Sequence, residues 1–192
     1  MHVCTDRLPA GASLVTTEFP MTSRPPFRVL ILCTGNSARS IFGEYLLRAK
    51  GHGRFETYSA GAHPTGRVHP LDVRVLQERY GLDAGGARSK SWDEFRDVTF
   101  DFVITVCDRA RESCPFWPGQ PVVGHWGSPD PAAAQGTEVE KYRAFVDVAS
   151  QIARRVELFC AFTDDKLAAF RVADLNAIAR EGRLPAGEGP AR

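Results

Sequence analysis

The sequence predicts a doubly wound α/β domain, built on a mainly parallel four-stranded sheet with helices on both faces. Short apolar runs of strand length alternate with longer amphipathic stretches of helix length, and no internal repeat interrupts them. The 192 residues are 43% hydrophobic and 24% charged, which suits one hydrophobic core. Ligands of such folds bind at the carboxyl ends of the strands, so residues that follow a strand are the first candidates for function.

Each expected element follows from its local pattern. Residues 28–33 form a continuous apolar run typical of a buried parallel strand. Pro70 suits the first turn of a helix, and Gly81 suits the position beyond its last turn. The expected strands are residues 28–33, 54–61, 100–107 and 120–126. The expected helices are residues 40–50, 69–82, 91–97, 137–162 and 164–181.

The two ends of the chain lack this regular pattern. Residues 1–26 are rich in Pro, Ser and Thr, and we expect a mobile N-terminal extension in which Met21 is a candidate start of translation. Residues 27–163 form the expected domain, and residues 164–192 are expected to be a C-terminal helical extension and tail.

Charge and hydropathy argue against several kinds of partner. A net charge of +1 provides no basic field for non-specific binding of nucleic acid. No run approaches the roughly 20 apolar residues of a membrane span, and the N-terminal segment lacks the apolar core of a signal peptide. We therefore expect a cytoplasmic protein with neither a nucleic acid nor a membrane partner.

The stretch CTGNSARS, residues 33–40, has the composition of an anion-binding loop. Cys33 ends the first expected strand, and Gly35 and Asn36 tolerate left-handed backbone conformations that turn successive N–H groups inward. The helix near Arg39 directs its positive end to the same point, and the guanidinium can grip two oxygens of a tetrahedral anion. This environment should lower the pKa of the Cys33 thiol. The expected oxyanion-binding residues are Thr34, Gly35, Asn36, Ser37, Ala38 and Arg39, with Ser40 as a further catalytic candidate.

The five cysteines are an odd number, which argues against a static disulfide framework. Cys107 ends the third expected strand as Cys33 ends the first, and Cys114 follows in a polar, Arg-rich segment expected to be an exposed loop. This loop must move for the two thiols to meet, because a rigid helix holds residues seven apart about 10 Å from each other. Cys160 is expected to pack in the core and Cys4 to be incidental. Taken alone, the other three also fit buried or incidental thiols.

These motifs resemble the low-molecular-weight tyrosine phosphatase superfamily, especially its thioredoxin-coupled arsenate reductases. CTGNSARS followed by Glu44 resembles the active-site loop, and further landmarks occur in the family's order. They are YSAG at 58–61, SKSW at 89–92, VITVCD at 103–108 and HWGSPDPA at 125–132. The resemblance covers about residues 28–162 and implies the low-molecular-weight phosphatase fold.

The resemblance also implies a role for each candidate. Asp130, which alone would be an ordinary turn residue before Pro131, becomes the general acid. Cys33 would attack arsenate, Cys107 would attack the adduct and expel arsenite, and Cys114 would resolve the resulting disulfide. Thioredoxin would be the electron donor, and no cofactor would be bound.

Two departures from the family favour arsenate over a phosphoester. The stretch DPAAA lacks the tyrosine pair that follows D-P in the phosphatases, and Ala38 replaces a cysteine found in many members. The alternative is a phosphomonoester hydrolase that forms a phosphocysteine at Cys33. A third, non-enzymatic possibility is a phosphate or arsenate sensor.

We expect no metal. Cys and His residues do not cluster at the spacings of a zinc site. The potassium site of some family members would fall on Asn36, Glu44 and Ser59, but Trp92 stands where its Asp belongs.

Overall fold

The computed structural model describes residues 25–182. The expectations about Met21, Cys4 and most of the N-terminal extension lie outside these residues, as does the tail at 183–192. Within residues 25–182, no helix is long and apolar enough to cross a membrane.

Four parallel strands form one sheet, in the order β2-β1-β3-β4. They are β1 (Phe27–Cys33), β2 (Phe55–Gly61), β3 (Phe102–Thr105) and β4 (Val122–His125). The register pairs Cys33 with Gly61 and Leu32 with Thr105, so the strand ends lie side by side. The predicted α/β class is confirmed, and all strand pairs in the described part of the chain are parallel.

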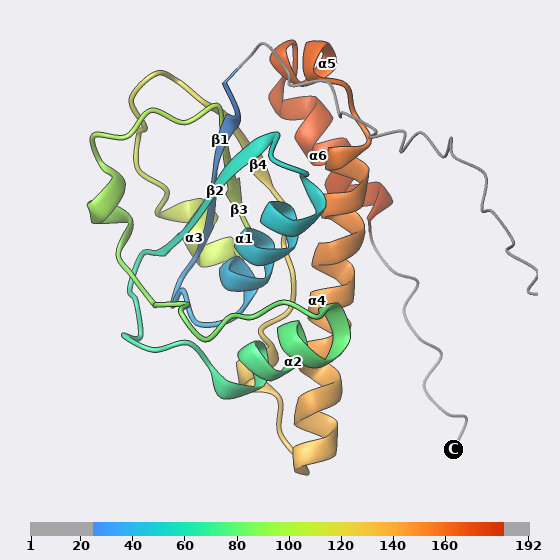
Figure 1. The fold of residues 1–192 in the computed structure, drawn as a ribbon. Helices are drawn as coiled ribbons and strands as arrows, with labels where there is room; N and C mark the ends of the chain where they lie inside the picture. The colour runs from blue at the N-terminus through green and yellow to red at the C-terminus, as the bar shows by residue number, and fades with distance from the viewer. Residues whose placement is uncertain (1–24, 183–192) are drawn as a thin grey trace, which may run out of the picture.

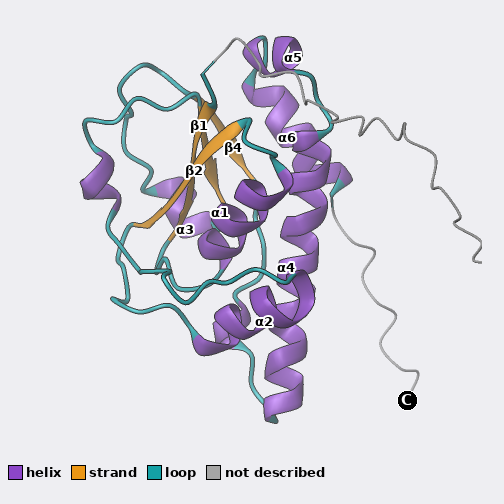
Figure 2. Cartoon of the chain, in the orientation of Figure 1, coloured by secondary structure: helices purple, strands orange, loops and turns teal. Residues whose placement is uncertain are grey.

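The helices lie on both sides of the strands (Figures 1 and 2). They are α1 (Arg39–Lys50), α2 (Pro70–Tyr80), α3 (Asp108–Glu112), α4 (Glu138–Cys160), α5 (Asp164–Ala168) and α6 (Val172–Glu181), with 3-10 turns η1 (Trp92–Phe95) and η2 (Pro131–Ala133). The crossover from β1 to β2 and the crossover from β3 to β4 run in opposite directions along the sheet. Because both crossovers are right-handed, α1 and α3 lie on opposite faces of the sheet. The order therefore reverses between β1 and β3, and a ligand site is expected outside their ends.

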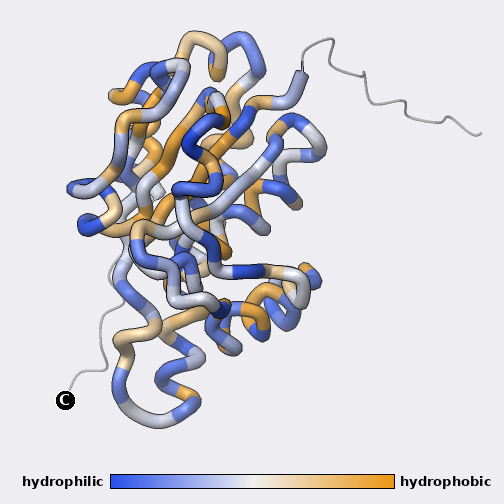
Figure 3. Tube along the Cα trace, turned by 90° about the vertical axis from the view of Figure 1, so that its left-hand side faces the viewer, coloured by the Kyte–Doolittle hydropathy of each residue, from blue (hydrophilic) through white to orange (hydrophobic). Residues whose placement is uncertain are grey.

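The core is formed by the strands and the inner faces of α1 and α4. Five consecutive residues of β1 from Val29 to Cys33 are buried, as a strand between two layers requires. Hydrophobic stretches run through the inside of the molecule, and hydrophilic ones concentrate in the outer turns (Figure 3). A capping box at Thr137 and Glu140 fixes the start of α4, whose apolar side packs on α1.

The predicted single helix at 164–181 is wrong, because the chain forms two helices there. The break at 169–171 turns Phe170 toward the aromatic rings of Phe102 and Phe159, at centroid distances of 6.1 and 6.0 Å. After the break, α6 packs against the edge strand β4. The side chain of Asn176 accepts a hydrogen bond from the backbone N–H of His125 at 3.2 Å. The extension thereby covers an edge that would otherwise expose unpaired backbone groups.

The segment after Cys107 also differs from the expectation, because it forms the short helix α3 instead of a loop. Ala110 is fully buried and fixes one side of this helix. The carboxylate of Asp108 lies 3.3 Å from Nε2 of His125 and 3.5 Å from the guanidinium of Arg111. An acidic side chain in the first turn also complements the helix dipole.

Candidate active site

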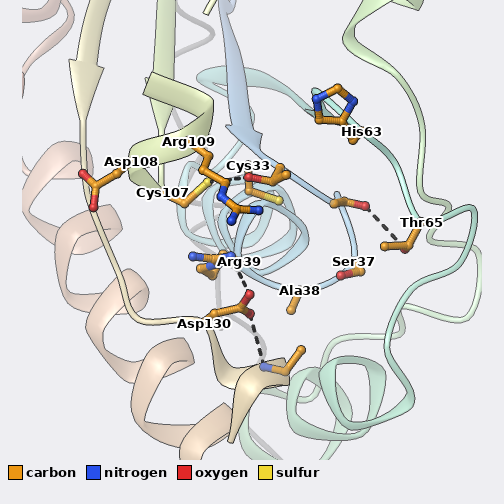
Figure 4. Close-up of a pocket in the computed structure, with 13 residues that line it drawn as sticks. Cys33, Ser37, Ala38, Arg39, His63, Thr65, Cys107, Asp108, Arg109 and Asp130 are labelled. Atoms are coloured by element: carbon orange, nitrogen blue, oxygen red, sulfur yellow. Dashed lines mark hydrogen bonds and ion pairs between the residues drawn. The ribbon is translucent and has the colours of Figure 1, made fainter. Parts of the chain in front are cut away.

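A cavity of about 560 Å³ lies at the carboxyl ends of the strands, where the strand order reverses (Figure 4). Residues that follow each of the four strands contribute to its wall. They are Cys33, Thr34, Gly35, Ser37, Ala38, Arg39, His63, Thr65, Cys107, Asp108, Arg109, Asp130 and Ala132. The structure thus gathers most of the predicted site residues around one cavity.

Cys33 lies at the base of this cavity and is 2% exposed. Its sulfur accepts a hydrogen bond from the backbone N–H of Asn36 at 3.1 Å and lies 3.0 Å from Oγ of Ser40. Asn36 has a φ of 44°, in the left-handed region, whereas Gly35 does not. Gly61 at the end of β2 permits the close approach of this loop, since a Cβ there would lie 2.7 Å from the carbonyl oxygen of Thr34.

The expected lowering of the Cys33 pKa is not found. Burial raises the pKa of this thiol, and the opposing hydrogen bonds from Ser40 and the charge of Arg39 do not overcome it. The sequence shows the donors and the cation around the sulfur, but it does not show how completely the thiol is removed from water. An oxyanion bound above the thiol is a base that can take its proton as the nucleophile attacks.

Asp130 is held at the mouth of the cavity by an ion pair with Arg39. Its Oδ2 lies 3.1 Å from the Arg39 guanidinium, and its Oδ1 accepts a hydrogen bond from the backbone N–H of Ala132 at 3.2 Å. Arg39 also donates to the carbonyl of Ser128 at 3.2 Å. The side chain of Asp130 is 48% exposed, so it faces both the cavity and the solvent.

Two further thiols lie at the two ends of α3. Cys107 is 6% exposed and lies on the wall of the same cavity as Cys33, with its sulfur 3.3 Å from Oγ1 of Thr34. Cys114 lies outside this cavity, in a second one of about 450 Å³ beside β4 and α6. Burial raises the pKa of the Cys114 thiol. The structure therefore brings Cys33 and Cys107 together but leaves Cys114 apart.

Asn36, Glu44 and Ser59 do lie together, as the family's potassium site implies. Asn36 donates to Oγ of Ser59 at 2.9 Å, and Ser59 donates to Oε2 of Glu44. However, the Nζ of Lys90 lies 3.5 Å from Oε2 of Glu44 and 3.3 Å from Oγ of Ser59. Glu44 and Ser59 therefore contact the ammonium group of Lys90, a cation that belongs to the chain itself, and the site does not fit a potassium ion. Within residues 25–182, no group of three or more His, Cys, Asp or Glu side chains is arranged to hold a metal.

Sequence reasoning missed Asp108, Arg109 and Ala132 of the cavity wall and four other residues at or near the site. His63 and Thr65 line the cavity, and their position after β2 was a usable signal. Lys90 lies within the SKSW landmark, but nothing in the sequence placed its amine beside Glu44. Arg155 of α4 is 1% exposed and donates to the carbonyls of Trp126 and Gly127 and to Oγ of Ser128. It thus supports the segment that leads to Asp130, although helix periodicity does not predict a buried arginine.

Comparison with known proteins relates this geometry to a family. The model of the family described as low molecular weight phosphotyrosine protein phosphatase matches residues 28–157. An arsenate reductase of Bacillus subtilis is 36% identical over 131 residues, which are 68% of this chain and 93% of that protein.

Solved structures agree with this. An arsenate reductase in the phosphate binding state has a TM-score of 0.60 and 27% identity, over 70% of this chain and 97% of the other. A thioredoxin-dependent arsenate reductase of Corynebacterium glutamicum has a TM-score of 0.51 and 25% identity, over 71% of this chain and 65% of the other.

Proposed function

Because the chain belongs to the low molecular weight phosphotyrosine protein phosphatase family, we propose that it is an arsenate reductase that converts arsenate to arsenite. The observation that carries the proposal is the second thiol, Cys107, on the wall of the cavity that holds Cys33. Hydrolysis of a phosphoester needs one nucleophilic thiol. Reduction of an oxyanion also needs a second thiol, which attacks the sulfur of the first and displaces the reduced product.

The first step joins arsenate to Cys33. The anion lies within the loop of residues 33–39, where backbone N–H groups, the positive end of α1 and the Arg39 guanidinium offset its charge. The Cys33 sulfur attacks arsenic, and an oxygen of arsenate leaves as water after taking protons from the Cys33 thiol and from Asp130. The product is an arsenic(V) thioester-like adduct on Cys33, with no change of oxidation state.

The second step carries the two electrons. The Cys107 thiolate attacks the sulfur of Cys33, a disulfide forms between them, and arsenic leaves with the electron pair of the S–As bond as arsenite. Cys114 then attacks the sulfur of Cys107, which releases Cys33 and leaves a Cys107–Cys114 disulfide. A dithiol reductant restores both thiols, and we assign this role to thioredoxin, on which a structurally similar reductase is dependent.

The three thiols must be free between turnovers, and the described cysteines are free in the structure. A reducing compartment keeps them so, and the proposed location is therefore the cytoplasm.

The test compares serine variants of each cysteine. Arsenate turnover is followed as NADPH consumption with thioredoxin and thioredoxin reductase, alongside hydrolysis of an aryl phosphate. Cys33→Ser should abolish both activities, whereas Cys107→Ser and Cys114→Ser should abolish only arsenate reduction. The matched control is Cys160→Ser, because Cys160 lies on α4 and lines neither the active-site cavity nor the one beside Cys114. It should retain turnover.

Two results would overturn the proposal. Arsenate reduction that survives in both Cys107→Ser and Cys114→Ser would remove the relay. Brisk cleavage of the aryl phosphate by a wild type that does not reduce arsenate would identify a phosphatase instead.

A further inference from the structure

A continuous chain of polar contacts leads from Lys90 to the sulfur of Cys33. The ammonium group of Lys90 contacts Ser59 and Glu44. Asn36 donates from Nδ2 to Oγ of Ser59 and to Oγ of Ser40, both at 2.9 Å. Oγ of Ser40 lies 3.0 Å from the Cys33 sulfur. Every side chain between Lys90 and Cys33 is therefore tied to the next.

The members of this chain are shielded from water. Asn36, Ser40 and Ser59 are 0% exposed, and the side chains of Lys90 and Glu44 are 10% and 11% exposed. The carboxylate of Glu44 would destabilise the folded state in such surroundings if it had no cationic partner. Glu44 also belongs to α1, the helix that begins directly after the anion loop. If it were not neutralised, it would oppose the binding of an oxyanion in that loop.

Glu44 has two cationic partners, which differ in position. Arg48 contacts Oε1 from the outer side of α1, and its side chain is 51% exposed. Lys90 contacts Oε2 from the inner side, where the same oxygen also accepts the hydrogen bond from Ser59. The third contact of the Lys90 ammonium, at 3.4 Å, is the carbonyl oxygen of Arg88. A carboxylate, a hydroxyl and a carbonyl supply the oxygen ligands that a monovalent cation would use.

We propose that Lys90 is a positioning residue that acts as a tethered monovalent cation. Its ammonium group neutralises Glu44 and holds Ser59, and through Ser59 it holds Asn36 and Ser40 in the positions that shape the anion loop around Cys33. The protein carries this cation in its own sequence, so its anion site works without a free one. Removing the charge leaves a set of oxygen ligands to which a free potassium or ammonium ion then binds.

The test removes the charge of Lys90 and retains its stem. In Lys90→Met the backbone N–H still donates to Oδ1 of Asn36, because that bond, at 2.8 Å, does not involve the side chain. Two quantities are measured in chlorides of potassium, ammonium and tetramethylammonium at equal ionic strength. They are the dissociation constant of inorganic phosphate, by calorimetry, and the rate at which iodoacetamide alkylates Cys33, by mass spectrometry.

The wild type should give the same values in all three salts. Lys90→Met should bind phosphate about tenfold more weakly in tetramethylammonium, which is too large to enter the site, and recover most of this loss in potassium or ammonium. Its alkylation rate should change with the same salts. A merely structural role for Lys90 would give a loss that no cation restores.

Two further variants complete the design. Lys90→Met combined with Glu44→Gln should lose the response to potassium, because the carboxylate that attracts the ion is gone. Lys50→Met removes another lysine, the last residue of α1, which pairs with Glu157 at the surface, and it should match the wild type in every salt. If Lys90→Met does not fold, Lys90→Gln, which retains a hydrogen-bond donor, is measured in its place.

The inference would be overturned if Lys90→Met bound phosphate like the wild type in tetramethylammonium, or if its loss were equal in all three salts. It would equally be overturned by a potassium response in the wild type. The inference rests on the proposed function only in that an oxyanion binds at the loop. Phosphate binding and alkylation need no arsenate turnover, so a wild type that fails to reduce arsenate would refute the reductase and leave this test intact.

Discussion

Asp72 is a buried acid whose removal should change how stability depends on pH. It lies in the first turn of α2, is 0% exposed, and neither carboxylate oxygen has a hydrogen-bond partner among residues 25–182. Burial raises the pKa of Asp72 well above its usual value. The folded protein therefore holds this carboxyl group in its protonated form at pH values where the unfolded chain has already released the proton.

The sign of the effect follows from this difference. Below the pKa of the unfolded chain, about 4, both states bind the proton and the contribution of Asp72 to stability is fully present. As pH rises from there through the raised pKa of the folded state, that contribution is lost, at up to about 1.4 kcal/mol per pH unit. Between pH 4 and pH 7 the loss has a ceiling of about 4 kcal/mol.

The variant Asp72→Asn has nearly the same shape and cannot titrate, so it should not show this loss. Urea unfolding at several pH values between 5 and 8 gives the free energy of unfolding of both proteins. We expect the difference, variant minus wild type, to increase with pH and then to level off above the folded-state pKa. The buried amide has its own cost, but that cost does not depend on pH.

The matched control is Asp97→Asn, at an exposed aspartate, which should shift stability by less than about 0.5 kcal/mol at each pH. A difference between wild type and Asp72→Asn that stays constant over the whole range would refute the reasoning. It would mean that the carboxyl group of Asp72 has the same pKa in the folded and unfolded chains.

Two other variants test the acid and its support. Asp130→Asn should lower kcat for arsenate reduction by about 10²- to 10⁴-fold and leave KM nearly unchanged, because it removes a proton donor and not an anion contact; a loss below tenfold in steady-state kinetics would exclude Asp130 as the acid. Arg155→Met should lower the free energy of unfolding by about 3 kcal/mol in urea, because it leaves the buried carbonyl of Trp126 and the partly buried carbonyl of Gly127 without this donor. Arg155→Lys should recover part of that loss, and equal stability of Arg155→Met and wild type would contradict the role given to Arg155.

The fold was predictable because each element carries its own local signal. The apolar run at β1, Pro70 at the start of α2 and Gly81 in the left-handed cap that ends it all act within a few residues. The failures at 164–181 and at α3 have a different cause. Phe170 interrupts a helical pattern because its ring packs against Phe102, which is distant in sequence, and no local pattern contains that contact.

The candidate site was predictable to the extent that it follows strand ends. Cys33 ends a strand, Cys107 and Asp130 each come soon after one, and a parallel sheet brings such residues to one edge. The position of Lys90 relative to Glu44 depends on how the segment between α2 and β3 packs, which no spacing in the sequence encodes. The pKa of Cys33 was predicted in the wrong direction for the same reason, because burial is a property of the whole fold.

The proposed relay between the two ends of α3 depends on how weakly that helix is held. Seven residues at a rise of about 1.5 Å each place Cys107 and Cys114 about 10 Å apart along a helix, whereas a disulfide needs Cα atoms within about 7 Å. The helix must therefore unwind. Five residues are too few for a helix to be stable in water on its own, and the ion pairs of Asp108, whose side chain is 74% exposed, contribute little. The main cost of unwinding is that the methyl group of Ala110 leaves the core. Formation of the proposed second disulfide would thus disrupt few contacts, and it would leave residues 108–113 unwound, where a protein reductant could reach the sulfur atoms.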